Sequence, residues 1–169
     1  MKKTFILVFM VFTFSIFAFS EVKIGVINAQ KVIQQTKKGK EITGRLEKIG
    51  KVKQQKVETL QEKIKKLEKE LASPALNTQT REKKNMQLQT KRTELKRFIE
   101  DAQREMRQKS QTELSHLRQD IMPVIEKIGK DKGFTLILDL TTSGIAYFDK
   151  TIDVTNEVIA EYDKKYANK

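Results

Sequence analysis

The most constraining feature of this chain is a narrow apolar stripe that runs from Ile42 to Leu71 through a strongly polar segment. Apolar residues recur there at steps of three and four, the spacing of one helix face. Most of the other residues are lysine, glutamate and glutamine, which are good helix formers. A stripe this narrow is typical of a helix that packs against a single partner helix. The fold therefore needs a second long helix.

One position in the stripe is polar, because Lys53 stands between Ile49 and Val57 where heptad spacing requires an apolar residue. Three glycines also weaken this helix, by up to about 1 kcal/mol each relative to alanine: Gly39, Gly44 and Gly50. We expect Gly50 and Lys53, facing a polar stretch near Lys109, to form a flexible zone. The alternative is chance irregularity on a surface helix.

The second helix is predicted to follow a short break. Pro74 cannot continue a helix from within, and Asn77, Thr78 and Thr80 are good N-cap residue types for a new one. A second periodic apolar run then begins near Leu88. The sequence therefore predicts an antiparallel helical hairpin over 37–121 with its tip near 72–80. About 1.5 Å per residue gives each arm a reach of roughly 50 Å.

The two chain ends are predicted to build a small head from residues 21–36 and 122–169. Three short apolar runs are interpreted as strands: 22–28, 134–140 and 145–148. A helix over 153–167 closes the chain. Pro123 is expected to mark the bend of the returning arm into the head. The expected fold class is α+β, a β-rich head with a long coiled-coil hairpin.

The predicted head is small for a single-chain core. About 65 residues is a size at which such a core is marginal, and the chain has no cysteine for a disulfide. Its strands also have open edges. Because association of identical heads would solve both problems, we expect a homo-oligomer.

The first twenty residues predict that the protein is exported. Lys2 and Lys3 precede an uncharged apolar run of about 15 residues, and Ala18 and Ser20 supply the small residues of a cleavage site. We expect residues 1–20 to be a secretory signal peptide that is removed after Ser20. An uncleaved membrane anchor is the alternative, but the run is short for a bilayer, which needs about 20 residues.

The positive charge is concentrated in the predicted arms. The chain has 34 Lys and Arg against 22 Asp and Glu, a net charge of +12 with pI near 9.8. Residues 37–121 hold 23 of the basic and 13 of the acidic residues, whereas the head is neutral. The candidate binding residues are basic side chains along both arms: Lys51, Lys53, Lys56, Lys63, Lys66, Lys84, Lys91, Arg92, Arg97, Arg104 and Arg107.

The sequence offers little for catalysis or metal binding. His116 is the single histidine and lies in a polar helical stretch, and cysteine is absent, so a soft-ligand metal site is excluded. No nucleophile motif or glycine-rich phosphate loop is present. Asp139 and Asp149 flank the expected third strand and are interpreted as turn formers. We expect no enzyme activity, no metal and no cofactor.

Three kinds of partner remain for a basic coiled chain. Specific nucleic-acid binding is disfavoured because Phe98 is the one aromatic residue on the arms and acids interrupt the basic residues. Anionic lipid would attract each well-placed lysine by about 1 kcal/mol, but the stripe is needed for the partner helix. An unfolded polypeptide held by many weak contacts fits best.

Both chain ends resemble the Skp/OmpH family of periplasmic chaperones. The residues that carry the resemblance are "KIGVINAQKVIQQTKKGKE" at the start and "VIEKIGKDKGFTLILD" and "GIAYFDKTIDVTNEVI" at the end. It extends from Val22 to about Tyr166. The resemblance implies a trimer whose three arms enclose a cavity, and an ATP-independent holdase for unfolded outer-membrane β-barrel proteins.

The same resemblance implies where identical heads would meet. It assigns six residues to the trimer core: Ile24, Val26, Leu136, Leu138, Ile145 and Tyr147. It also suggests lipopolysaccharide as a further partner, at positions that we do not assign. Non-specific binding of nucleic acid or anionic lipid by a basic coiled coil stays open as the alternative function.

Overall fold

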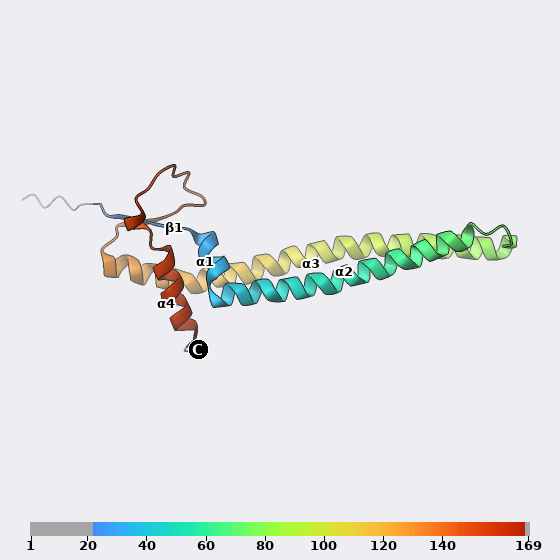
Figure 1. The fold of residues 1–169 in the computed structure, drawn as a ribbon, viewed down its shortest axis with the longest axis horizontal. Helices are drawn as coiled ribbons and strands as arrows, with labels where there is room; N and C mark the ends of the chain where they lie inside the picture. Colours follow the sequence, from blue (N-terminus) through green and yellow to red (C-terminus); the bar gives the residue numbers. More distant parts are fainter. Residues whose placement is uncertain (1–21, 168–169) are drawn as a thin grey trace, which may run out of the picture.

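The computed structural model describes residues 22–167, and the predicted signal peptide lies outside this part. A long helical hairpin projects from a small head that both chain ends build (Figure 1). In chain order the elements are β1 (Ile24–Ile27), α1 (Ala29–Gln35), α2 (Lys37–Leu71), α3 (Thr78–Lys132), β2 (Leu136–Asp139), the 3₁₀ turn η1 (Lys150–Ile152) and α4 (Thr155–Ala167). The fold is thus mostly helical with one small sheet.

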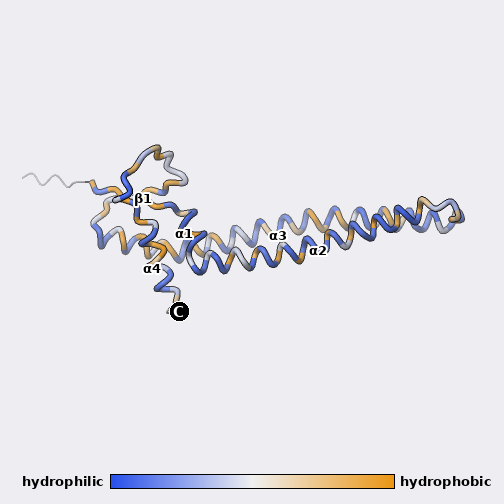
Figure 2. Tube along the Cα trace, in the orientation of Figure 1, coloured by the Kyte–Doolittle hydropathy of each residue, from blue (hydrophilic) through white to orange (hydrophobic). Residues whose placement is uncertain are grey.

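The arm consists of α2 and the first two-thirds of α3, which lie side by side (Figure 1). The predicted hairpin is therefore confirmed. Ile42, Leu60 and Leu88 are buried along the contact between the helices, whereas many of the other arm residues are hydrophilic (Figure 2). Burial of one stripe per helix holds the arm together, as heptad spacing predicts.

Polar side chains close the tip of the hairpin. The Asn77 side chain accepts a hydrogen bond from the backbone N–H of Thr80 at 2.8 Å and so caps α3. The Arg81 guanidinium donates to the carbonyl oxygens of Leu71 at 2.9 Å and Ser73 at 3.1 Å. These carbonyls lie where α2 ends and lack helical partners of their own. The break predicted around Pro74 is confirmed.

The head is built on two parallel strands. Ile24 pairs with Leu136 and Ile27 with Asp139, and the whole arm serves as the connection between the strands. The other edge of β1 is occupied as well, because the Val154 N–H donates to the Val26 carbonyl at 3.0 Å. The core of the head lies where α1, α4, the start of α2 and the end of α3 meet: Ile27, Val32, Ile42, Leu117, Ile121, Val124, Ile128, Val154, Val158 and Tyr162.

The third strand expected over 145–148 is not formed in the single chain. After β2 the chain turns at once, because the Asp139 carboxylate accepts hydrogen bonds from the Thr141 N–H at 3.0 Å and the Thr141 hydroxyl at 2.7 Å. Gly144 then adopts a positive φ of 63°, which glycine tolerates. This turn leads residues 145–148 away from the sheet, where they have no strand partner.

Pro123 lies inside α3, which continues through it from the arm into the head, so the bend expected there is not a break in the helix and stays a prediction. A proline inside a helix removes one backbone hydrogen bond and crowds the preceding turn. Here Ile121 and Val124, on either side of it, are both buried in the head core. That burial offsets the cost, so one helix serves both arm and head.

Candidate functional site

Five of the eleven candidate binding residues are held in ion pairs. Three pairs join α2 to α3, namely Lys53–Glu105, Arg92–Glu68 and Lys84–Glu70, and two lie within α3, namely Lys91–Glu94 and Arg104–Asp101. Surface ion pairs contribute about 0.2–1 kcal/mol. A bound ligand that carries carboxylates could therefore exchange with these partners at small cost.

The other six candidates are exposed and form no ion pair with any residue in 22–167: Lys51, Lys56, Lys63, Lys66, Arg97 and Arg107. The arm thus carries uncompensated positive charge along both helices, in reach of an acidic ligand.

Lys53 fills the polar position of the seam with an ion pair. Its Nζ lies 2.7 Å from Oε2 of Glu105 and 5.9 Å from the centre of the Phe98 ring. Lys109 Nζ lies 3.2 Å from the other oxygen of Glu105. Hydrogen bonds from both lysines, with their charges, hold the pKa of Glu105 below its usual value. The two polar stretches predicted to face each other are thus joined through a carboxylate that sequence reasoning missed.

The predicted flexible zone borders a shallow groove of about 320 Å³. Gly50, Val57 and Met106 line it beside Lys53, and a Cβ atom at Gly50 would meet no atom within 4 Å. The seam is loosely filled here compared with the buried contacts at Leu60 and Leu88. Flexibility itself stays a prediction.

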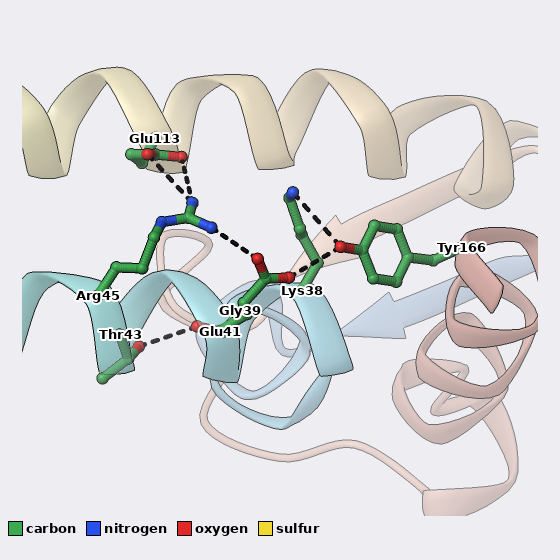
Figure 3. Close-up of polar contacts among 7 residues, drawn as sticks. All are labelled: Lys38, Gly39, Glu41, Thr43, Arg45, Glu113 and Tyr166. Atoms are coloured by element: carbon green, nitrogen blue, oxygen red, sulfur yellow. Dashed lines mark hydrogen bonds and ion pairs between the residues drawn. The ribbon is translucent and has the colours of Figure 1, made fainter. Parts of the chain in front are cut away.

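A second polar cluster, the root cluster, joins three helices where the arm meets the head (Figure 3). Arg45 of α2 donates to Glu41 at 2.7 Å and to both carboxylate oxygens of Glu113 in α3 at 3.1 Å. The Tyr166 hydroxyl of α4 donates to Glu41 at 2.8 Å, and Lys38 lies over the Tyr166 ring, 5.2 Å from its centre. The Glu41–Arg45 spacing is the sequence signal that would have indicated it.

The Tyr166 hydroxyl is the main reason why the pKa of Glu41 lies below its usual value, and the charges of Lys38 and Arg45 add to this effect. Glu41 is therefore ionised at neutral pH and accepts hydrogen bonds from two different helices. The cluster fixes the end of α4 against the base of the arm.

In the head, the residues assigned to a trimer core fall into two groups. Ile24, Leu136 and Tyr147 are exposed in the single chain, to 39%, 47% and 84%, and Ile24 lies beside Leu136 in the sheet register. Val26 is buried inside its own chain, and Leu138 and Ile145 are half-buried. Exposed apolar side chains of this size gathered on one small head form a surface that water solvates poorly.

The described residues hold no cluster of metal-ligating side chains. Within 22–167 no group of three or more His, Cys, Asp or Glu could hold a metal ion, and His116 is exposed. Burial raises the pKa of Asp139, but hydrogen bonds from Thr141 and Ala29 outweigh that effect and lower it. Asp149 accepts from the Thr151 N–H at 2.8 Å. Both aspartates thus act as turn formers, as predicted.

No helix in the described part of the chain combines the length and the apolar character that a membrane crossing requires. The membrane anchor considered as an alternative for residues 1–20 falls outside that part.

Comparisons with known proteins give a family, a relative and a solved structure of the same fold. The family model described as "Outer membrane protein (OmpH-like)" matches residues 23–162. An uncharacterised protein of Aquifex aeolicus (strain VF5) is 31% identical over 143 residues, which are 82% of this chain and 84% of that protein. The crystal structure of a candidate OmpH-like outer membrane chaperone from Caulobacter crescentus CB15 has a TM-score of 0.74 at 18% identity and covers 84% of each chain. The chain therefore belongs to the OmpH-like outer membrane protein family.

Proposed function

We propose that this protein is a periplasmic, ATP-independent holdase that keeps unfolded outer-membrane proteins from aggregating. The family match over 23–162 and the fold shared with a candidate outer membrane chaperone support the chaperone class. The observation that carries the proposal is the arm itself, a thin hairpin whose basic side chains are exposed and in part uncompensated. Binding occurs through many weak contacts, so neither a nucleotide nor a catalytic group is required.

The proposed assembly is a homotrimer whose heads join and whose arms surround the client. Ile24 and Leu136 are neighbours on the sheet and exposed in one chain. In the single chain, the described residues add no further strand to the outer edge of β2. Joining three heads would bury the exposed apolar pair, and burial of apolar surface contributes roughly 25 cal/mol per Å². It would also give the open edge of β2 a neighbour, because open strand edges favour pairing.

The decisive experiment is suppression of aggregation of a urea-unfolded porin upon dilution. Mature protein, from residue 21 onward, is expected to keep the porin soluble without ATP. An equal amount of a neutral coiled-coil protein serves as control. Equal light scattering with and without the protein would rule out the holdase function. Export is checked separately by cell fractionation, where a cytoplasmic pool would contradict it.

A further inference from the structure

The distal part of the arm contains a groove between α2 and α3, of about 560 Å³, which we call the distal groove. Four lysines line it, Lys63 and Lys66 from α2 and Lys83 and Lys91 from α3, together with the apolar side chains of Leu67 and Met86. Positive charge and apolar surface therefore lie within one recess. Lys83 was not among the candidates of the sequence analysis.

The apolar part of the distal groove is open to solvent. Met86 is 66% exposed, whereas Leu67 is half-buried at the contact between the helices. Methionine is unbranched and flexible, so it can adapt to apolar side chains of different shapes. This part of the groove can accept single apolar side chains without demanding one particular residue.

The charge of the distal groove is poorly balanced. Glu70 is its one acidic lining residue, and it is already paired with Lys84. Glu94 pairs with Lys91 at 2.6 Å. Lys63, Lys66 and Lys83 form no ion pair with other residues of the described range. A carboxylate that enters the groove would meet three ammonium groups that are not held in an ion pair of their own.

The carboxylates next to the groove respond to this positive field. The pKa of Glu94 is lowered first by the hydrogen bond from Lys91, and the charges of Lys56 and Lys63 lower it further. The pKa of Glu70 is lowered by Lys84 and, in addition, by Lys66. A ligand carboxylate in the same place is therefore stabilised in its ionised form.

We propose that the distal groove is a client subsite that binds short unfolded segments in which Asp or Glu stands beside an apolar residue. This inference rests on the holdase function and narrows it to a place and a class of segment. A polypeptide fits the groove better than a bilayer does, because the only strongly exposed apolar side chain here is Met86, and membrane-surface helices need a broad apolar face.

The test measures fluorescence anisotropy of a labelled peptide with alternating Asp and Leu, added to full-length mature protein. The variant Lys63→Glu/Lys66→Glu reverses two charges in the groove. The matched control Lys65→Glu/Lys69→Glu makes the same charge change at exposed positions outside the groove lining. We expect the groove variant to bind about tenfold more weakly and the control to change by about twofold or less.

The apolar part is tested with a second matched pair. Met86 and Val52 are both 66% exposed, but only Met86 lines the distal groove. Met86→Ser should weaken binding of the Asp–Leu peptide, and Val52→Ser should leave it unchanged. A peptide with Ser in place of Leu should bind wild type and Met86→Ser equally.

Three outcomes would overturn the distal groove as a client subsite. Equal weakening by both charge reversals would show a general field effect, and no weakening by either would show binding elsewhere. The third outcome is that Lys63→Glu/Lys66→Glu no longer binds phosphatidylglycerol vesicles but still binds the peptide. This result would show that the groove binds lipid. The porin assay separates the two proposals, because wild-type activity there establishes the holdase whatever the groove variants do.

Discussion

The hydroxyl of Tyr166 donates a hydrogen bond of 2.8 Å to Glu41, which joins the last helix of the chain to the first turns of the arm. Glu41 is in turn paired with Arg45, and Arg45 with Glu113. The angle at which the arm leaves the head is therefore supported by contacts among three helices (Figure 3).

Replacing Tyr166 by Phe removes this hydroxyl and keeps the ring, which lies parallel to that of Tyr162 with 6.3 Å between centres. We expect the free energy of unfolding in urea to fall by about 0.5–1.5 kcal/mol, because the hydrogen bond to Glu41 and the longer one from Lys38, at 3.5 Å, are both lost. We also expect a broader distribution of distances between spin labels at the arm tips. Tyr162→Phe is the control, since no hydrogen bond of that hydroxyl is formed within 22–167. Equal tip-distance distributions for Tyr166→Phe and wild type would contradict a positioning role.

Replacing Lys53 by Leu should stabilise the arm. The substitution removes the ion pair between Lys53 and Glu105, and a surface ion pair contributes about 0.2–1 kcal/mol. Glu105 keeps Lys109 as a partner. A partly buried leucine in the seam returns about 1–2 kcal/mol. Hydrogen exchange around Gly50 should slow, whereas Lys51→Leu, on the exposed face, should have no such effect. Faster exchange in Lys53→Leu would show that the ion pair stabilises the contact between the helices more than a leucine does.

Replacement by alanine should have opposite effects on stability at two glycines of α2. A Cβ at Gly39 would lie 1.6 Å from the carbonyl oxygen of Ile33, whereas a Cβ at Gly44 would meet nothing within 4 Å. Gly39→Ala should therefore cost about 3 kcal/mol through overpacking at the turn between α1 and α2. Gly44→Ala should gain up to about 1 kcal/mol of helix propensity. Thermal unfolding of both variants tests this difference. Similar midpoints for Gly39→Ala and Gly44→Ala would contradict the close contact between residue 39 and the Ile33 carbonyl oxygen.

Four glutamates of the arm predict a loss of stability in acid. The pKa values of Glu41, Glu70, Glu94 and Glu105 all lie below the usual 4.5 because of hydrogen bonds from Tyr166, Lys84, Lys91 and Lys53 respectively. A carboxylate with a lowered folded-state pKa contributes stability above pH 4.5, and this contribution disappears as the pH falls through the lowered value.

Thermal midpoints measured from neutral pH down to about pH 3 check this dependence. A variant with all four glutamates replaced by glutamine should be less stable than wild type at neutral pH. Its thermal midpoint should also fall less than that of wild type when the pH is lowered. A parallel decline of wild type and variant would assign the acid effect to other groups.

Replacing Leu136 by Lys should prevent trimer formation without unfolding the chain. Leu136 is 47% exposed in one chain, so the lysine can reach solvent in the monomer, but three lysines would be buried in the joined heads. Light scattering is expected to give the monomer mass for Leu136→Lys and the trimer mass for wild type. Val52→Lys, at an exposed arm position, is the control. A monomeric wild type at micromolar concentration would contradict the trimer.

Much of the arm could be predicted from the order of the residues alone. Heptad spacing from Ile42 to Leu71 and the break at Pro74 depend on local chemistry, and the structure has both where they were expected. The sequence offered Asn77, Thr78 and Thr80 as caps of the second helix, and the structure uses the first of them. The same holds for Asp139 and Asp149, which form turns through residues two positions later. Periodicity and capping act over a few residues, so a single sequence reports them.

Tertiary structure decided what depends on distant partners. The sequence shows a polar residue at 53, but only packing brings Glu105 to it, 52 positions away. Residues 145–148 have the composition of a strand, yet a strand needs a hydrogen-bonded neighbour, and the turn at Asp139 leaves them without one. Pro123 does not end α3, because burial of Ile121 and Val124 offsets the cost of a proline inside the helix. Local propensity yields wherever contacts between remote segments contribute the larger free energy.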